Sequence, residues 1–403
     1  MAKSVMSLKI KLLTQLFSFI VLGCLSSISV AGAIDKHDKI ISAIPHASLL
    51  LAETKDVSGI SIRPDQLLVP ASTLKVVTAY LAIKRWGLEH KFYTDFYYLD
   101  GVLWIKGFGD PYVTSEEILL MSAGLKKLKL GKINSIKVDN SYFPELRLDG
   151  RGNSDNPYDA GNAALVVNFN TLFLDKTEKG VSSAEAQTPI TPLALSLGAK
   201  LALGKKRISL PGGRDMAANY FAQVFSKLHF KRNLSISVAQ LPKSAKFIYR
   251  HQSSKTLSEL LTVMLKYSNN FIANQLFLML PETSENQAEL SVLAAQKNYT
   301  GLLEREFAFK GANFVDGAGL SRKNQISSQQ LLQVLEVFKP WIDLLPERRK
   351  GLKVKTGTLS DNHSLAGYVV DKNQQWQPFV LLINKWMPSD YRFQVARALL
   401  KLK

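Results

Sequence analysis

The sequence contains a single cysteine, Cys24, which lies near the start of the chain. Disulfide frameworks, zinc–thiolate sites and cysteine nucleophiles all need thiols beyond this position, so the sequence excludes them from the rest of the chain. After the first residues, no apolar run approaches the roughly 20 residues that a membrane-spanning helix needs. Histidine is scarce as well, and none of the 6 histidines lies in a recognisable metal or nucleophile motif. We therefore expect no metal and no cofactor.

Residues 1–33 have the pattern of an export signal. Three lysines precede a mostly apolar stretch at 12–25, and Ala31–Ala33 offers a small-residue cleavage site. This pattern predicts a cleaved signal peptide and a periplasmic mature protein. Lipid attachment at Cys24 is the alternative, because Val21–Cys24 loosely resembles a lipobox.

Acidic side chains are also in deficit. The chain has 51 Lys and Arg against 33 Asp and Glu, a formal net charge of +18. The basic groups are scattered, which is typical of a solvated surface or of association with an anionic envelope surface. We expect no nucleic-acid partner, because an exported protein rarely meets nucleic acid. The three densest groups are Lys126–Lys129, Lys205–Arg207 and Arg348–Lys350.

The length of 403 residues favours two domains over one. Between 92 and 213, short alternating runs are separated by Gly, Asn, Asp and Pro, which predicts a β-rich inserted domain. Residues 34–91 and 214–403 are expected to form one discontinuous catalytic domain around it. Helical periodicity is found at 72–86, 215–228, 256–267 and 271–280, and strands are expected at 353–358, 365–370 and 379–384.

The motif Ser72–Lys75 (STLK) is the one S-x-x-K of the sequence. It opens an amphipathic segment that predicts a helix from Ser72 to Trp86. Lys75 then lies one helical turn from the Ser72 hydroxyl, on the same face. Burial and a neighbouring cation, for which Lys355 is the candidate, lower the pKa of a lysine. Lys75 is therefore a candidate base for a Ser72 nucleophile.

The motif Ser268–Asn270 (SNN) lies between two helical segments, where a short loop aims polar groups into a cleft. Ser268 is a candidate for passing a proton to the leaving amine, and Asn270 for holding the substrate backbone. The overlapping Tyr267–Asn269 also fits a Y-x-N pattern of some β-lactamases. The residues that follow this motif in the chain favour the assignment of Ser268 and Asn270 as the functional pair.

A third motif, KTGT, lies on a predicted strand that borders the cleft. Its ammonium and its two hydroxyls are groups that bind a carboxylate, and its glycine lets a substrate approach the backbone closely. The backbone N–H groups of Ser72 and Thr358 are expected to form an oxyanion hole. Four residues of this motif join Asn270 as candidate substrate-binding residues: Lys355, Thr356, Gly357 and Thr358.

In this order, the three motifs resemble the set found in β-lactamases and penicillin-binding proteins. Other segments resemble the D-alanyl-D-alanine carboxypeptidase/endopeptidase family, the low-molecular-mass penicillin-binding proteins with a domain inserted after the S-x-x-K helix. The similarity extends over most of the chain after the signal. The segments are Pro70–Ser72, Gly107–Pro111 (GFGDP), Asp316–Arg322 (DGAGLSR) and Lys355–Leu359 (KTGTL).

This resemblance implies an α+β fold with a β-lactamase-like catalytic domain, an antiparallel sheet flanked by helices. It implies that Ser72 attacks the carbonyl between two D-alanines of a peptidoglycan peptide, or between D-alanine and a cross-linking residue, and that β-lactams acylate Ser72. The sequence departs from the family pattern at Asn269, Asn274 and Ala318, where the family often has Asp, Glu and Ser. These departures leave the substrate preference open.

Two alternatives remain. A β-lactamase needs rapid deacylation, yet no E-x-x-L-N element lies between 268 and 355 and the long insert is unlike that class. A non-catalytic scaffold of the same fold would bind anionic envelope polymers through its basic surface. Retention of all three motifs argues against this alternative. Carboxypeptidase and endopeptidase action differ only in what lies beyond the scissile bond, and the motifs fit both.

Overall fold

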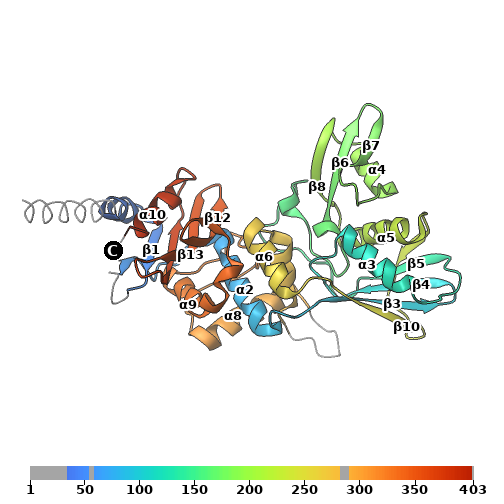
Figure 1. The fold of residues 1–403 in the computed structure, drawn as a ribbon, viewed down its shortest axis with the longest axis horizontal. Coiled ribbons are helices and arrows are strands. Elements are labelled where there is room, and N and C mark those ends of the chain that lie inside the picture. The colour runs from blue at the N-terminus through green and yellow to red at the C-terminus, as the bar shows by residue number, and fades with distance from the viewer. Residues whose placement is uncertain (1–33, 54–58, 282–289, 402–403) are drawn as a thin grey trace, which may run out of the picture.

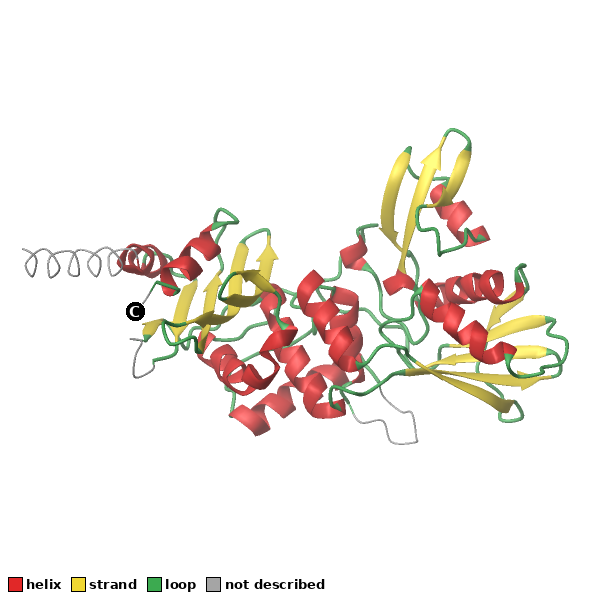
Figure 2. Ribbon diagram, viewed as in Figure 1, coloured by secondary structure: helices red, strands yellow, loops and turns green. Residues whose placement is uncertain are grey.

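A computed structural model describes residues 34–53, 59–281 and 290–401. The expected signal peptide and its alternative lipidation site at Cys24 therefore lie outside the described residues. Figures 1 and 2 show two bodies that each contain β-sheet, with a lobe of helices between them. In the described ranges, no helix combines the length and the apolar character needed to cross a bilayer.

The first body is built on a six-stranded antiparallel sheet of order β11-β12-β13-β14-β1-β2. Its middle strand β13 carries an almost unbroken run of buried residues, because both faces of the sheet are covered. The strands are β1 (Ala47–Leu51), β2 (Ile60–Ile62), β11 (Glu347–Arg349), β12 (Leu352–Leu359), β13 (Asn362–Val370) and β14 (Trp376–Ile383).

Alternation along the strands divides their side chains between two cores. Val354 packs with α10 (Tyr391–Leu399) and helical residues 34–42, whereas Lys355, the next residue, points to the helical lobe. The lobe buries one continuous apolar cluster against this second face. Its elements are η1 (Ala71–Leu74), α2 (Lys75–Trp86), α6 (Leu257–Tyr267), α7 (Asn270–Met279), α8 (Val292–Phe307), α9 (Ser328–Phe338) and η4 (Lys339–Leu344).

The second body contains a five-stranded sheet of order β10-β3-β4-β5-β9 and a smaller sheet of order β7-β6-β8. Helices α3 (Ser115–Lys126) and α5 (Arg214–Phe230) pack on the larger sheet, and α4 (Pro192–Gly198) packs on the smaller one. The strands are β3 (Tyr93–Leu99), β4 (Val102–Gly107), β5 (Ser135–Asp139), β6 (Thr171–Thr177), β7 (Gly180–Ser183), β8 (Gly204–Ser209), β9 (Ser235–Val238) and β10 (Lys246–Gln252). Two short turns, η2 (Pro157–Asp159) and η3 (Asn168–Asn170), face the lobe.

The limits of this second body differ from those expected. Residues 214–252 were assigned to the catalytic domain, but α5, β9 and β10 join the sheet and the apolar core of the second body. Phe221 and Phe225 of α5 are fully buried there. Its two sheets are covered by three helices. We therefore propose limits of 93 and 252 for the inserted domain, with the chain returning to the lobe at α6.

Candidate active site

The Ser72 hydroxyl lies on a strained turn between strand β12 and the lobe. Ser72 is in η1, which continues directly into α2, so the predicted helix from Ser72 to Trp86 is observed with a 3₁₀ first turn. Ala71 has φ 51, a left-handed conformation that costs a non-glycine residue free energy. Two asparagine side chains hold this turn through the residue before Pro70. Val69 N donates to Asn384 Oδ1 (2.8 Å), and Val69 O accepts from the side-chain amides of Asn384 and Asn362.

Two glycines make room for this turn. A Cβ on Gly319 would lie 1.9 Å from Ala71 O, and a Cβ on Gly357 would lie 2.7 Å from Pro70 O. Gly357 was expected to admit the substrate to the backbone. In the structure its open side is filled by the turn that leads into Ser72.

The Lys75 amine is fully buried and lies against the Ser72 hydroxyl. Nζ donates to Ser72 Oγ (3.0 Å), to Asn270 Oδ1 (2.8 Å) and to Ala318 O (2.6 Å). Burial lowers the pKa of Lys75 to about 7, against the opposing effect of the Asp316 carboxylate. At neutral pH a large fraction of this amine is therefore unprotonated.

Asp316 organises the loop that faces Lys75. Its buried carboxylate accepts from the N–H groups of Ala318 (2.7 Å), Gly319 (2.7 Å) and Ser321 (2.8 Å). These bonds turn the Ala318 carbonyl toward Lys75. The sequence of the DGAGLSR segment indicated a family resemblance only, and this role of its aspartate was not predicted.

The second motif forms the junction between α6 and α7, as expected. Ser268 is the left-handed C-cap of α6 (φ 56), and the Asn269 side chain accepts from Ile272 N (2.9 Å) as the N-cap of α7. The side chains of Ser268 and Asn270 contact the two lysines of the site, whereas Tyr267 is 65% exposed. Of the two readings of this tripeptide, the geometry favours Ser268 and Asn270 over Tyr267 and Asn269.

Lys355 is the second buried amine. Nζ donates to Ser268 Oγ (2.9 Å) and to Thr356 O (2.7 Å). Burial lowers the pKa of Lys355 well below its ordinary value, with further lowering by nearby Lys75, Arg348 and Arg392. In the described part of the chain, no carboxylate lies within ion-pair distance of this amine. Lys355 was expected to depress the pKa of Lys75, but burial is the main cause for both amines.

The end of the KTGT strand is held by Arg392 of α10. Its Nη1 donates to Gly357 O (2.8 Å) and to Thr358 Oγ1 (2.8 Å), while the Thr358 side chain remains exposed. Because the guanidinium donates, the Thr358 hydroxyl keeps its own proton for an acceptor such as a carboxylate. Arg392 was missed, since an arginine beyond the last strand carries no motif.

The fold and this pairing of two serines with two buried lysines are typical of the penicillin-binding-protein class. The chain belongs to the D-Ala-D-Ala carboxypeptidase 3 (S13) family, whose sequence model matches residues 52–195 and 208–401. The family resemblance is therefore confirmed.

Individual relatives agree with this placement. The chain is 25% identical to the D-alanyl-D-alanine carboxypeptidase DacB of Haemophilus influenzae over 205 residues, which are 45% of this chain but only 43% of that relative. Penicillin-binding protein 4 of the same organism has a similar structure (TM-score 0.72, 22% identity, 90% of this chain and 98% of that chain). A predatory peptidoglycan endopeptidase of Bdellovibrio bacteriovorus is also similar (TM-score 0.53, 16% identity, 89% and 90%). These structures confirm the α+β, β-lactamase-like fold.

The glycine contacts predict that Gly319→Ala displaces the Ala71 carbonyl and with it Ser72. A displacement of about 1 Å at a nucleophile costs on the order of 100-fold in rate. We expect a loss of this size in the second-order rate of acylation by a fluorescent penicillin. Gly87→Ala is the matched control, because Gly87 has the same φ of 76 with nothing within 4 Å of its added Cβ. Equal rates in the two folded variants, checked by thermal melting, would contradict the account.

The lowered pKa of Lys75 predicts a pH profile for the same reaction. Below a pKa of about 7, the fraction of neutral amine, and so the acylation rate, rises about tenfold per pH unit. Above that pKa the rate levels off. Stopped-flow labelling between about pH 5.5 and about pH 8.5 measures the profile. A rate independent of pH across this range would argue against Lys75 as the base.

Proposed function

We propose that this protein is a serine-type D-Ala-D-Ala carboxypeptidase or endopeptidase that acts on peptidoglycan stem peptides through an acyl-enzyme at Ser72. The orientation of the Lys75 amine is the observation that carries the proposal. Asn270 Oδ1 and Ala318 O can only accept hydrogen bonds, so they hold the two hydrogens of the neutral amine. The protonated amine donates its third hydrogen to Ser72 Oγ, 3.0 Å away. In the neutral amine the lone pair takes this direction and can accept the Ser72 proton.

In the first step, neutral Lys75 takes the Ser72 proton while Oγ attacks the carbonyl carbon of the penultimate residue. The oxyanion that forms is expected to accept from the N–H groups of Ser72 and Thr358, and each such donor contributes about 2.7–4 kcal/mol in well-studied hydrolases. The C–N bond then breaks, and Lys75 passes the proton that it took from Ser72 through Ser268 to the leaving amine, so that Lys75 is neutral again. The product of this step is an ester between Ser72 and the shortened peptide.

Lys355, Thr356 and Thr358 are proposed to bind the terminal carboxylate of the substrate. Burial and surrounding cations lower the pKa of Lys355, and an arriving carboxylate raises that pKa and so favours the protonated amine. That charge in turn favours the neutral form of Lys75. Only one of the two amines is then protonated when the acyl transfer begins.

Release of the peptide requires water to attack the Ser72 ester. Neutral Lys75 takes a proton from this water as it attacks and gives the proton to Ser72 Oγ as the C–O bond breaks, which regenerates the free enzyme. A leaving group of D-alanine corresponds to carboxypeptidase action, and a cross-linked residue to endopeptidase action. The names of the relatives include both activities, and penicillin-binding protein 4 of H. influenzae has been crystallised with a β-lactam.

Ser72→Ala tests the assignment. We expect purified wild-type protein to be labelled covalently by fluorescent penicillin, to release the label slowly, and to liberate D-alanine from a peptide ending in D-Ala-D-Ala. The variant should lose the labelling and the release of D-alanine, because no other residue is assigned as nucleophile. Gel fluorescence and a coupled D-alanine assay measure the two reactions.

The alternatives give different outcomes in this experiment. Rapid turnover of the penicillin without D-alanine release would favour a β-lactamase. A wild-type protein that neither labels nor releases D-alanine would favour a non-catalytic scaffold. Labelling that survives in Ser72→Ala would overturn the choice of nucleophile.

We further propose that the protein acts in the periplasm after removal of residues 1–33, and that its positive charge attracts it to the anionic envelope surface. Expression of the full chain in a Gram-negative host should then give a periplasmic form whose N-terminus is Ile34, by intact mass and N-terminal sequencing. A lipid-modified N-terminus at Cys24 would instead support the lipoprotein alternative, and a cytoplasmic full-length chain would contradict export.

A further inference from the structure

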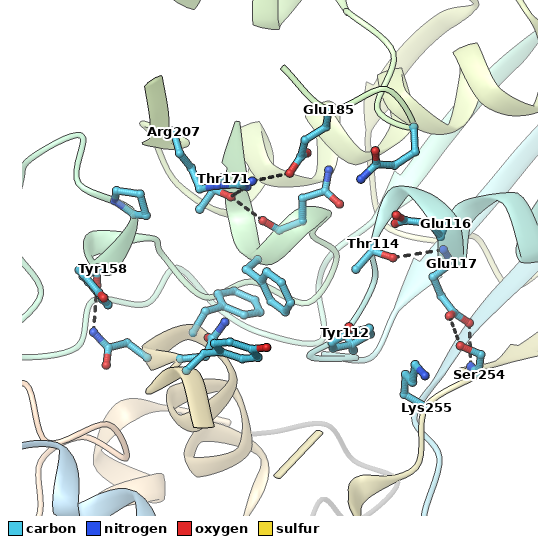
Figure 3. A pocket seen from close by; sticks show the side chains of 18 of the residues that line it. Tyr112, Thr114, Glu116, Glu117, Tyr158, Thr171, Glu185, Arg207, Ser254 and Lys255 are labelled. Carbon is cyan, nitrogen blue, oxygen red and sulfur yellow. Dashed lines mark hydrogen bonds and ion pairs between the residues drawn. The ribbon is translucent and has the colours of Figure 1, made fainter. Parts of the chain in front are cut away.

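A large pocket adjoins the site on the side of Asn270. It has a volume of about 790 Å³ and lies between the second body and the α6–α7 junction (Figure 3). Its walls include the first turn of α3, η3, strands β6 and β8, and residues 269–271. Pockets of roughly 300–1,000 Å³ hold whole small-molecule ligands, so the volume of this pocket is larger than a single amino-acid side chain requires.

Asn270 connects the pocket to the reaction. Its Oδ1 accepts from Lys75 Nζ, and its Nδ2 lies 3.5 Å from Tyr158 O in the pocket wall. The cations near Lys355 attract the carboxylate end of a substrate to the opposite side. Given the proposed function, the acyl half of the substrate therefore extends past Asn270 toward the pocket. In peptidoglycan that half leads to the sugar chain to which the stem peptide is attached.

The pocket contains a strained segment. Asn168, Phe169 and Asn170 are consecutive non-glycine residues with φ of 52, 57 and 56. Buried side-chain bonds hold them, including Ser115 N to Asn168 Oδ1 (3.0 Å) and Asn170 Nδ2 to Gly161 O (2.8 Å). Strain of this kind is retained mainly where it positions groups for a ligand. Here it places Phe169 in the wall, with its ring centroid 5.5 Å from that of Tyr112.

Most charges of the wall are already neutralised. Arg207 pairs with Glu185, Lys255 pairs with Glu259, and Glu117 bonds to His251 and to Ser254. Four of the five charged side chains that line the pocket are engaged in this way. The wall thus has little free charge for a charged ligand.

The other residues that line the pocket include several aromatic rings and planar amides. Phe169 and Phe271 line the pocket, and Tyr158 and Tyr267, which also line it, are 60% and 65% exposed. The C–H face of a sugar ring is apolar and slightly positive, and packs on the negative face of an aromatic ring. Its hydroxyl and N-acetyl groups hydrogen-bond to planar amides such as that of Gln187.

We propose that this pocket binds the uncharged amino-sugar part of the glycan to which the donor stem peptide is attached. The inference rests on the proposed peptidase function and names its substrate as glycan-linked peptide. Stacking of one sugar on an aromatic ring corresponds to a gain on the order of tenfold in affinity.

The test compares two substrates that share one pentapeptide ending in D-Ala-D-Ala. One is the free peptide, and the other carries the disaccharide of N-acetylglucosamine and N-acetylmuramic acid. For the wild-type protein we expect kcat/KM for D-alanine release to be about tenfold higher with the disaccharide, through a lower KM. Glu116→Trp, which places an indole in the pocket from an exposed position of α3, should bring this ratio to about 1.

Leu119→Trp is the matched control, because Leu119 is exposed on the same helix and is not among the pocket residues. It should keep the wild-type ratio, and melting curves should show both variants folded. A wild-type ratio of about 1 would overturn the glycan site while leaving the peptidase intact. An equal loss on both substrates in Glu116→Trp would show that peptide occupies the pocket, which also overturns the proposal. Absence of D-alanine release and of penicillin labelling would instead overturn the function on which it rests.

Discussion

The site depends on an amine that is buried without a counter-charge in contact with it. Lys75 has three hydrogen-bond partners, and none of them is a carboxylate. Burial removes the solvation that keeps a lysine protonated, and the acceptors fix the directions of its remaining hydrogens. Chemistry that a solvated lysine cannot perform near neutral pH becomes available because the surrounding apolar cluster is close-packed.

The neighbouring features serve this arrangement. The Asp316 carboxylate lies near enough to raise the Lys75 pKa, but its oxygens are occupied by backbone N–H groups, so it shapes the loop without pairing with the amine. The strained Ala71 and the closely fitting Gly319 bring the nucleophile's turn onto that loop. Asn384 and Asn362 tie the same turn to the sheet. The three motifs contribute the groups that we propose to react, and these other residues set the distances between them.

The sequence was informative where function fixes residue types at short spacing. Ser72 and Lys75 are one helical turn apart, and Ser268 lies at a junction between helices that two amphipathic segments predict. Arg392 and Asn384 could not be found in this way, because their contacts join segments far apart in the chain and have no local pattern. The boundary at 213 was wrong for a related reason. The periodicity of α5 indicates that the helix has an apolar face, but not which of the two cores buries that face.

The buried amine also affects the folding equilibrium. In the unfolded chain Lys75 has an ordinary lysine pKa near 10.5, whereas in the folded protein its pKa is about 7. Between these two values the unfolded chain binds more protons than the native one, so folding releases protons to the solvent. By linkage, the contribution of this residue to stability becomes more favourable as the medium turns alkaline across that window, and is least favourable below it. Acid therefore lowers the stability of the native state through the same residue that we propose as the catalytic base.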